Sequence, residues 1–421
     1  MRCMGFLRQA LGMTLIACVD GAVVLGGAPE GRQFHQSRTL PFSELHLRLW
    51  AEPASCPVGV PVAVYAELSN PHTAPVVWHG VFGWWGRSGR VHRTALPRLM
   101  LSSAYEQVEY KDGYRSTHPN LSRCCLLDPG VVRRTKTFVV HGGERAASFL
   151  GRPGLVLLHV EMLDGQRPPT RVISNSVSLE LTAPEGGDAT ALNRLQAEGL
   201  LGLLGYWRPL PYDKAERALG SLRGFLAEFP QSVYTPFVRF ALAQGYLRRK
   251  QYSEAAGLFR EVADRHADTP VAEDALLLLG ECYRLSGQPA LAAWAFREVV
   301  RRYPDSPAAA DALETLTDVH RYPELLFAED RRLDAEISFP ANEVLALQTT
   351  VATASELTGV VLELAPEYAR PWMSRDANKR PLRSFMADWA SRQNGLWSPT
   401  ADGGYRLGAD PSRKLPSKPI D

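Results

Sequence analysis

Residue types that could support catalysis occur in this chain, but their spacing does not form a catalytic motif. The tripeptide at 141–143, His-Gly-Gly, has the composition of an oxyanion-binding loop, yet no matching serine and acid follow it. The tetrapeptide at 86–89, Gly-Arg-Ser-Gly, has the wrong glycine spacing for a nucleophile elbow. The chain also lacks a His-Glu-x-x-His motif and a glycine-rich phosphate loop. We therefore expect turns at both segments, no enzyme activity and no cofactor.

Cysteine spacing gives no sign of a metal site. The cysteines beyond the first 28 residues are Cys56, Cys124, Cys125 and Cys282, and no two of them have the spacing of zinc ligands. In an oxidising compartment Cys56 could pair with Cys124 or with Cys125, and the sequence leaves this choice open. Cys282 falls on an apolar helix face, where a thiol usually acts as a small buried side chain.

An aromatic cluster is the one segment suited to binding a sugar or a peptide. Its members are Trp78, Phe82, Trp84 and Trp85, with His79 and His92 nearby. Exposed rings of this kind could form a glycan platform. The alternative is that these rings pack an inserted segment onto the face of a β-sheet.

Three short segments of matching chemistry recur every 37 residues and predict a helical repeat array over residues 190–330. The segments begin at Phe229, His266 and Tyr303. Such a period is typical of stacked helical hairpins, each of which buries its apolar face only against its neighbours. We expect the array to begin with a helix over 192–205, where glycines at 199, 202 and 205 would permit close helix contact.

The best unit of the array resembles a tetratricopeptide repeat. Leu279, Gly280 and Tyr283 occupy the expected positions of its first helix, while Ala292 and Phe296 occupy those of the second. Small Gly280 and Ala292 would let the two helices approach, while Tyr283 and Phe296 would fill the space beside them. The 37-residue spacing resembles that of the periplasmic coordinators of the Tol-Pal group and of the lipoprotein that serves outer-membrane barrel assembly. This resemblance implies a scaffold that binds envelope proteins.

The tetratricopeptide resemblance also implies a partner-binding groove, formed by fixed positions of each first helix. These positions are Phe237, Phe240, Gln244 and Leu247 in one unit, Asp274, Leu277, Glu281 and Arg284 in the next, and Asp311, Glu314, Asp318 and Arg321 in the last helix. Such a groove would run from apolar to acidic and suit an extended segment with aliphatic and basic side chains. The alternative is that these residues form solvated helix faces.

Residues 37–185 alternate with the period of two that is typical of β-strands. Val60, Val62 and Val64 show this alternation, as do Leu45, Leu47 and Leu49. Short strands separated by glycine, proline and asparagine turns predict an antiparallel β-sandwich. The region resembles the immunoglobulin-like modules of bacterial envelope proteins, and the stretch at about 79–125 is expected to be an insertion.

Residues 333–408 have a mixed pattern that predicts a small α/β domain. We expect strands at 336–339 and 359–364, helices at 342–358 and 381–394, and a closing hairpin around Asp402. This order resembles the short N-terminal domain shared by secretins and TonB-dependent receptors, although residues 368–379 lack the strand found there. The resemblance implies docking to a secretin or another outer-membrane machine.

Both ends of the chain differ from the rest. Residues 1–28 contain Arg2, Arg8 and a short apolar run, as in an export signal. The tetrapeptide at 15–18, Leu-Ile-Ala-Cys, resembles a lipobox, which implies lipidation of Cys18; ordinary cleavage after residue 28 is the alternative. Residues 409–421 are rich in proline, lysine and serine, which predicts a disordered tail.

Composition narrows the possible partners. The chain has 47 basic and 45 acidic residues, which gives no general attraction for nucleic acid. It also has no uninterrupted apolar stretch of about 20 residues, as a membrane-spanning helix would require. We therefore expect an exported, periplasmic scaffold with a possible lipid anchor. A peptidoglycan- or polysaccharide-binding protein is the second hypothesis, and an enzyme with its site in the insertion is the third.

Overall fold

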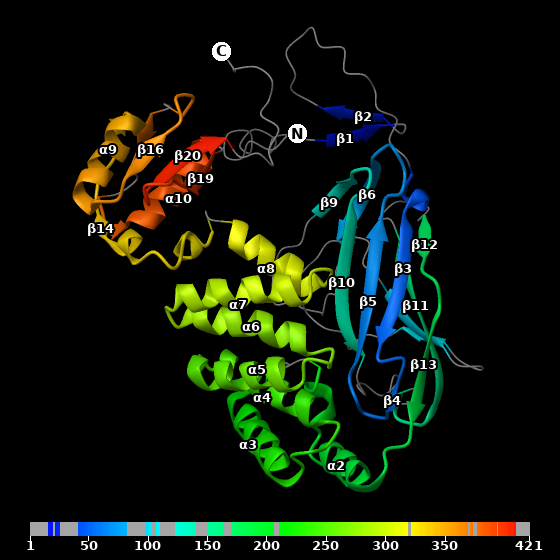
Figure 1. Cartoon of the computed structure of the whole chain (residues 1–421). Helices are drawn as coiled ribbons and strands as arrows, with labels where there is room; N and C mark the ends of the chain where they lie inside the picture. The colour runs from blue at the N-terminus through cyan, green and yellow to red at the C-terminus, as the bar shows by residue number, and fades with distance from the viewer. Residues whose placement is uncertain are drawn as a thin grey trace, which may run out of the picture. The chain divides into compact units, whose positions relative to one another are not determined.

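The computed structural model divides the chain into two compact units, Met1–Ala241 and Leu242–Asp421 (Figure 1). It describes residues 16–19, 22–25, 41–81, 98–102, 107–109, 123–139, 150–163, 170–205, 210–318, 321–368, 371–373, 377–393 and 395–409.

A three-stranded antiparallel sheet in the first unit has the order β10 (Val132–Val139), β5 (Val62–Ser69), β3 (His46–Glu52). Its alternation is the predicted one, because Leu47 and Leu49 of β3 are buried while His46 and Arg48 are exposed. The strand β5 is buried almost throughout, as expected for the central strand of a sheet.

The second sheet of this unit has six strands. Its members are β4 (Ser55–Pro57), β13 (Val177–Thr182), β11 (Gly154–Leu163), β7 (Arg98–Ser102) and β8 (Gln107–Glu109) in that order, with β12 (Arg171–Ile173) also paired to β11. One pair, β13 with β4, is parallel, so the predicted antiparallel pattern holds for the other pairs only. The strand β3 contacts β11, β12 and β13, which brings the two sheets together. An immunoglobulin-like arrangement stays a prediction.

Part of the predicted insertion at 79–125 belongs to the sheet. The strand β7 pairs with β11, and its Leu99 and Leu101 are buried. The strands β6 (Val76–Val81) and β9 (Arg123–Leu127) form a separate antiparallel pair. Near the start of the chain, β1 (Ile16–Val19) pairs with β2 (Ala22–Leu25). The rest of the predicted signal segment and the tail beyond Ala409 lie outside the described residues.

The predicted disulfide of Cys56 is not formed. Cys56 has a free, buried thiol on β4, and burial raises its pKa to about 11. The strand β4 pairs with β13, whereas the backbone of Cys124 and Cys125 belongs to β9 in another sheet. Cys282 is likewise a free, buried thiol, as expected for a small apolar side chain in a core.

The first helix of the array is shorter than predicted. The helix α2 spans Gly186–Ala197, and Gly199 then adopts a left-handed φ of 66° that ends it. A short 3₁₀ turn, η2 (Leu201–Leu203), follows before α3 (Tyr212–Glu228). The prediction of one helix over 192–205 is therefore wrong, because a glycine that was interpreted as a packing position instead ends the helix.

Three hydrogen bonds join α2 and the residues just before α4 (Thr235–Arg248) to their surroundings in the first unit. The Tyr234 hydroxyl donates a hydrogen bond of 2.6 Å to the main-chain oxygen of Val58. The Asp188 carboxylate of α2 accepts hydrogen bonds from the Ser232 hydroxyl and the Val233 amide, at 2.7 and 3.1 Å. The helix α4 continues across the boundary between the two units.

The 37-residue period is repeated in the main-chain geometry of the helical hairpins. The helices are α5 (Tyr252–Arg265), α6 (Ala272–Leu285), α7 (Pro289–Arg302) and α8 (Pro307–Thr317). Lys250 and Gly287, one period apart, both adopt a left-handed φ, of 61° and 72°. One residue further on, the amides of Gln251 and Gln288 donate equivalent hydrogen bonds, of 3.0 and 2.8 Å, to Tyr246 and Tyr283. Each hairpin therefore turns in the same way.

Gly280 permits the close approach of α6 and α7 that the sequence predicted. A Cβ atom at this position would lie 2.6 Å from Cε1 of Phe296, whose side chain is fully buried. Gly257, in α5, has open space around the equivalent point.

We expect Gly280→Ala to lower the free energy of unfolding by about 1–3 kcal/mol, because the ring of Phe296 must move. Gly257→Ala is the matched control, and it should stabilise the chain by about 0.5–1 kcal/mol through helix propensity alone. Urea denaturation of both variants measures the difference. Equal effects of the two substitutions would contradict the close contact.

The C-terminal region has the predicted α/β character. A sheet of order β16 (Leu362–Leu364), β20 (Tyr405–Ala409), β19 (Gly395–Pro399) includes the expected closing hairpin. The helix α9 (Leu347–Thr358) contacts β16, and α10 (Leu382–Gln393) contacts β19. The strand β14 (Glu336–Ile337) pairs with β18 (Arg380–Pro381).

Two predictions for this region need correction. The helix expected from residue 342 begins only at Leu347, because Asn342 has a left-handed φ of 60° and β15 (Val344–Leu345) follows it. That strand pairs with β17 (Trp372–Met373), which lies in the polar segment expected to lack a strand. The pair was missed because each strand has only two residues.

The residues before β14 are attached to the C-terminal core by hydrogen bonds from one arginine, Arg383. Arg383 of α10 is 2% exposed and donates hydrogen bonds to the main-chain oxygens of Leu326, Phe327 and Asp330. Its Nε also donates to the Asp334 carboxylate at 2.9 Å. We call residues 321–335 the strut; it contains η3 (Pro323–Leu325) and η4 (Arg331–Asp334).

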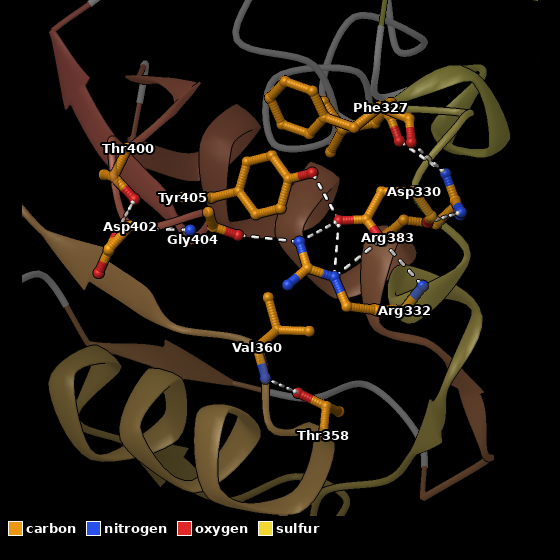
Figure 2. A network of polar contacts seen from close by, with 12 residues as sticks. Phe327, Asp330, Arg332, Thr358, Val360, Arg383, Thr400, Asp402, Gly404 and Tyr405 are labelled. Carbon is orange, nitrogen blue, oxygen red and sulfur yellow. Dashed lines mark hydrogen bonds and ion pairs between the residues drawn. The ribbon is translucent and has the colours of Figure 1, made fainter.

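Figure 2 shows a second set of contacts, around Asp330 of the strut. The Asp330 carboxylate accepts hydrogen bonds from Arg332 and from the Tyr405 hydroxyl, at 2.7 and 2.8 Å. Arg332 also donates a hydrogen bond of 2.8 Å to the main-chain oxygen of Gly403. The ring centres of Phe327 and Tyr405 lie 4.3 Å apart. The strut is thus bonded to both α10 and β20.

Replacing Arg383 with methionine should lower the free energy of unfolding by about 3 kcal/mol or more, since three carbonyl oxygens and a carboxylate lose their donor. The control is Arg392→Met in the same helix, where the side chain is exposed and the expected change is below about 0.5 kcal/mol. Thermal denaturation followed by circular dichroism compares them. A loss below about 1 kcal/mol for Arg383→Met would show that the strut is held by other contacts.

Candidate functional site

The apolar end of the predicted groove is not open surface. Phe237, Phe240 and Gln244 of α4 are buried, and Leu247 is half-buried. These positions share one face of α4, since they are spaced three or four residues apart. Apolar rings at helical spacing are core residues more often than ligand contacts, and here the core interpretation holds for Phe237 and Phe240.

The middle of the predicted groove is neutralised within the chain. Glu281 of α6 is buried and forms an ion pair of 2.8 Å with Arg284. The same guanidinium lies 3.4 Å from the Glu324 carboxylate and 5.1 Å from the ring centre of Tyr322. Leu277 is buried, and Asp274 is half-buried.

Asp311 of α8 has an unusual environment. Burial is the main cause that raises its pKa to about 7, and the negative charges of Glu314 and Asp274 raise it further. The side chain is nevertheless only half-buried, and Glu314 is exposed. Among the described residues, the Asp311 carboxylate has no hydrogen-bond donor and no cation as a partner.

The last two predicted groove residues lie after α8. The Asp318 carboxylate accepts a hydrogen bond of 3.1 Å from the Arg321 amide, and Arg321 lies 5.4 Å from the ring centre of Tyr322. The structure therefore brings Arg284 and Arg321 to the same tyrosine ring. The other part of the surface contains three acidic residues, Asp274, Asp311 and Glu314. We call this part the acidic face of α6 and α8.

The sequence analysis did not predict Tyr322 and Glu324, which both contact Arg284. We call this part of the surface, where the charges are paired within the chain, the neutral end. Tyr322 and Glu324 lie in the strut, where the 37-residue mapping has no equivalent position. An aromatic and an acidic residue directly after the last groove arginine were the only available signal.

The other predicted sites involve residues whose side chains the structure does not describe. Trp78 lies in β6 and Cys18 in β1, but the structure does not describe their side chains, and Phe82, Trp84 and Trp85 lie outside the described residues. The described part of the chain contains no cluster of histidine, cysteine and acidic residues that could hold a metal ion. Within the same residues, no helix has the length and apolar character needed to cross a membrane.

Comparison with known proteins identifies the helical hairpins. The profile of the tetratricopeptide-repeat family matches residues 240–307, which include α5, α6 and α7. The chain is thus a protein with stacked helical hairpins. Over the matched residues, these hairpins resemble tetratricopeptide repeats.

Other comparisons add little. No curated protein sequence matches the chain. One match is a crystal structure from Bacteroides ovatus ATCC 8483, described as that of a candidate protein binding protein. The alignment covers 33% of this chain and 72% of the chain in that crystal structure. The two are 16% identical with a TM-score of 0.20, which is too low to indicate a shared fold.

Asp311→Asn should stabilise the chain more at pH 8 than at pH 5. The folded-state pKa of Asp311, about 7, lies above the ordinary value of 3.8, so its contribution to stability falls as pH rises from about 4 to 7. Asparagine carries no charge and so avoids this loss of stability. The gain in the free energy of unfolding should be on the order of 1 kcal/mol, because the group is half-exposed. Urea denaturation at both pH values measures it, with the exposed Asp268→Asn as control. A gain that is the same at pH 5 and pH 8 would contradict the raised pKa.

Proposed function

We propose that this chain is a non-catalytic protein-interaction scaffold, and that the acidic face of α6 and α8 holds an extended segment of a partner protein. The observation that carries the proposal is the unpaired Asp311 carboxylate of α8, the helix that follows the hairpins matching the tetratricopeptide-repeat profile. The matched hairpins supply a rigid helical surface, since each hairpin is locked to the next.

The charges on this surface support a protein partner with basic side chains. Arg284 is already paired with Glu281 and Glu324, so the neutral end offers little to a charged ligand. Glu314 is exposed and Asp274 is half-buried, and both add to the negative potential at Asp311. Like charges placed together on a surface raise the free energy of the unbound state, and an oppositely charged partner relieves this.

The finer proposal is that the chain acts in the bacterial envelope. Its support is the sequence of the first 28 residues, with Arg2, Arg8 and the lipobox-like residues 15–18, together with the secretin-like pattern of residues 333–408. The partner would then be an envelope protein, such as a secretin or another outer-membrane assembly. Comparing membrane partitioning and N-terminal mass of the natural chain with those of Cys18→Ser tests this location. An unlipidated, soluble natural chain would remove the anchor from the proposal.

The binding surface is tested by charge reversal. Peptides selected on the full chain from a displayed library of extended 12-residue sequences would be synthesised with a fluorescent label, and their Kd values measured by polarisation. Glu314→Arg should weaken binding at least tenfold, which corresponds to about 1.4 kcal/mol. Glu254→Arg, an exposed acid in the first turn of α5, is the control and should leave Kd unchanged. Selected peptides that bind both variants equally well would place the binding surface elsewhere.

A further inference from the structure

The last hairpin of the array has only its first helix. Residues 326–339 lie one 37-residue period after α7, where a second helix would be expected. They form η4 and β14 instead, and Leu326, Leu333 and Phe339 are buried in the core of the C-terminal region. Within the described part of the chain, α8 is therefore equivalent to α6 but has no second helix to complete its hairpin.

The face of α8 that lacks a partner is identified by its equivalent on α6. Leu276 lies one turn before Gly280, on the face that meets Phe296 of α7, and is 1% exposed. Leu313 is the equivalent residue of α8, and it is 51% exposed. Thr317, the equivalent of Gly280, is exposed as well. The two leucines occupy the same position in the repeat, so the missing helix accounts for the difference.

This face is suited to burial. It consists of Ala310, Leu313 and Thr317, which are spaced at i, i+3 and i+7, and we call it the open face of α8. The Thr317 hydroxyl donates a hydrogen bond of 2.8 Å to the main-chain oxygen of Leu313, within the helix. Because this hydrogen bond would persist under a covering helix, burial of the open face leaves no donor unsatisfied.

We propose that an amphipathic helix of a partner protein completes the hairpin by packing on the open face of α8. The α6–α7 interface indicates the chemistry of this helix, because the open face continues the same stack one period later. On α7, fully buried side chains are spaced at i, i+4 and i+7, namely Ala292, Phe296 and Val299. The partner helix should repeat this apolar spacing. This surface differs from the acidic face, and its ligand is a helix rather than an extended segment.

Thr317 sets the size of the side chain that the partner can place opposite it. At Gly280 a Cβ atom would already lie 2.6 Å from Cε1 of Phe296. Thr317 carries a branched side chain at the equivalent position, so a phenylalanine cannot approach α8 as Phe296 approaches α6. The partner helix should therefore carry a smaller, aliphatic residue such as leucine at the position equivalent to 296.

The probe is a fluorescent peptide with the sequence of residues 287–303, with Phe296→Leu and a side-chain staple between two solvent-facing positions. The staple is needed because isolated helices of this length are marginally stable in water. Fluorescence polarisation with the full chain should show saturable binding. Leu313→Arg in the chain should weaken it by about tenfold or more, since a charge would be buried. Leu357→Arg in α9, where the leucine is 62% exposed, is the matched control and should leave Kd unchanged.

A size exchange tests the contact at Thr317. The stapled peptide that keeps phenylalanine at 296 should bind the natural chain about tenfold more weakly than the leucine peptide, because its ring overpacks the contact. Thr317→Gly in the chain should restore the affinity of the phenylalanine peptide without a matching gain for the leucine peptide. A general loosening of α8 would change both peptides alike, so this exchange distinguishes contact from stability.

Three results would overturn the inference. The first is a stapled leucine peptide that does not bind, and the second is one that binds Leu313→Arg as tightly as the natural chain. The third is a dimer of the natural chain that Leu313→Arg dissociates in analytical ultracentrifugation, because a second copy would then cover the open face. Each would leave the acidic face untouched, since charge reversal at Glu314 tests that surface with extended peptides. Comparing the two peptides on the natural chain needs no variant, so a poorly folded Thr317→Gly protein does not prevent the test.

Discussion

The second unit depends on one buried guanidinium, that of Arg383. Burying an arginine costs several kcal/mol unless its donors are satisfied, and here three main-chain oxygens and one carboxylate satisfy them. All these acceptors belong to residues 326–334, so a segment with little regular structure becomes part of the C-terminal core. The hairpins are joined to that core by the same segment, because η3 contacts both α7 and α10.

The charge asymmetry of the acidic face follows from this arrangement. Because Arg383 holds the strut in place, Glu324 and Glu329 meet Arg284 and Arg297, and the cations of α6 and α7 are used within the chain. No strut residue carries a positive charge to Asp311, although Arg321 lies close to it in sequence and contacts Tyr322 instead. A terminal segment that serves mainly as a cap thus also decides which carboxylates remain for a partner.

Periodicity predicted the helices of the repeats and the closing hairpin well, because each is specified by neighbours a few residues apart. The Gly280–Phe296 contact was also foreseen, since a small residue opposite a large one recurs at fixed offsets. Contacts that rely on main-chain acceptors were not foreseen, and Arg383, 49 residues from Asp334, shows why. A carbonyl group has no residue signature, and two-residue strands such as β15 and β17 are too short for a pattern. Burial of Phe237 and Phe240 was missed because an apolar groove and an apolar core have the same composition.

The repetition of the hairpin turn at Lys250 and Gly287 has a consequence for how such a chain could lengthen. Because φ and the following main-chain hydrogen bond repeat after 37 residues, a duplicated stretch of that length would enter the stack in register. Duplicating 272–308 would add one helix pair and move the terminal cap outward without altering its own contacts. An insertion of another length within a helix would shift the residues after it out of register, whereas a whole period preserves the hairpin geometry.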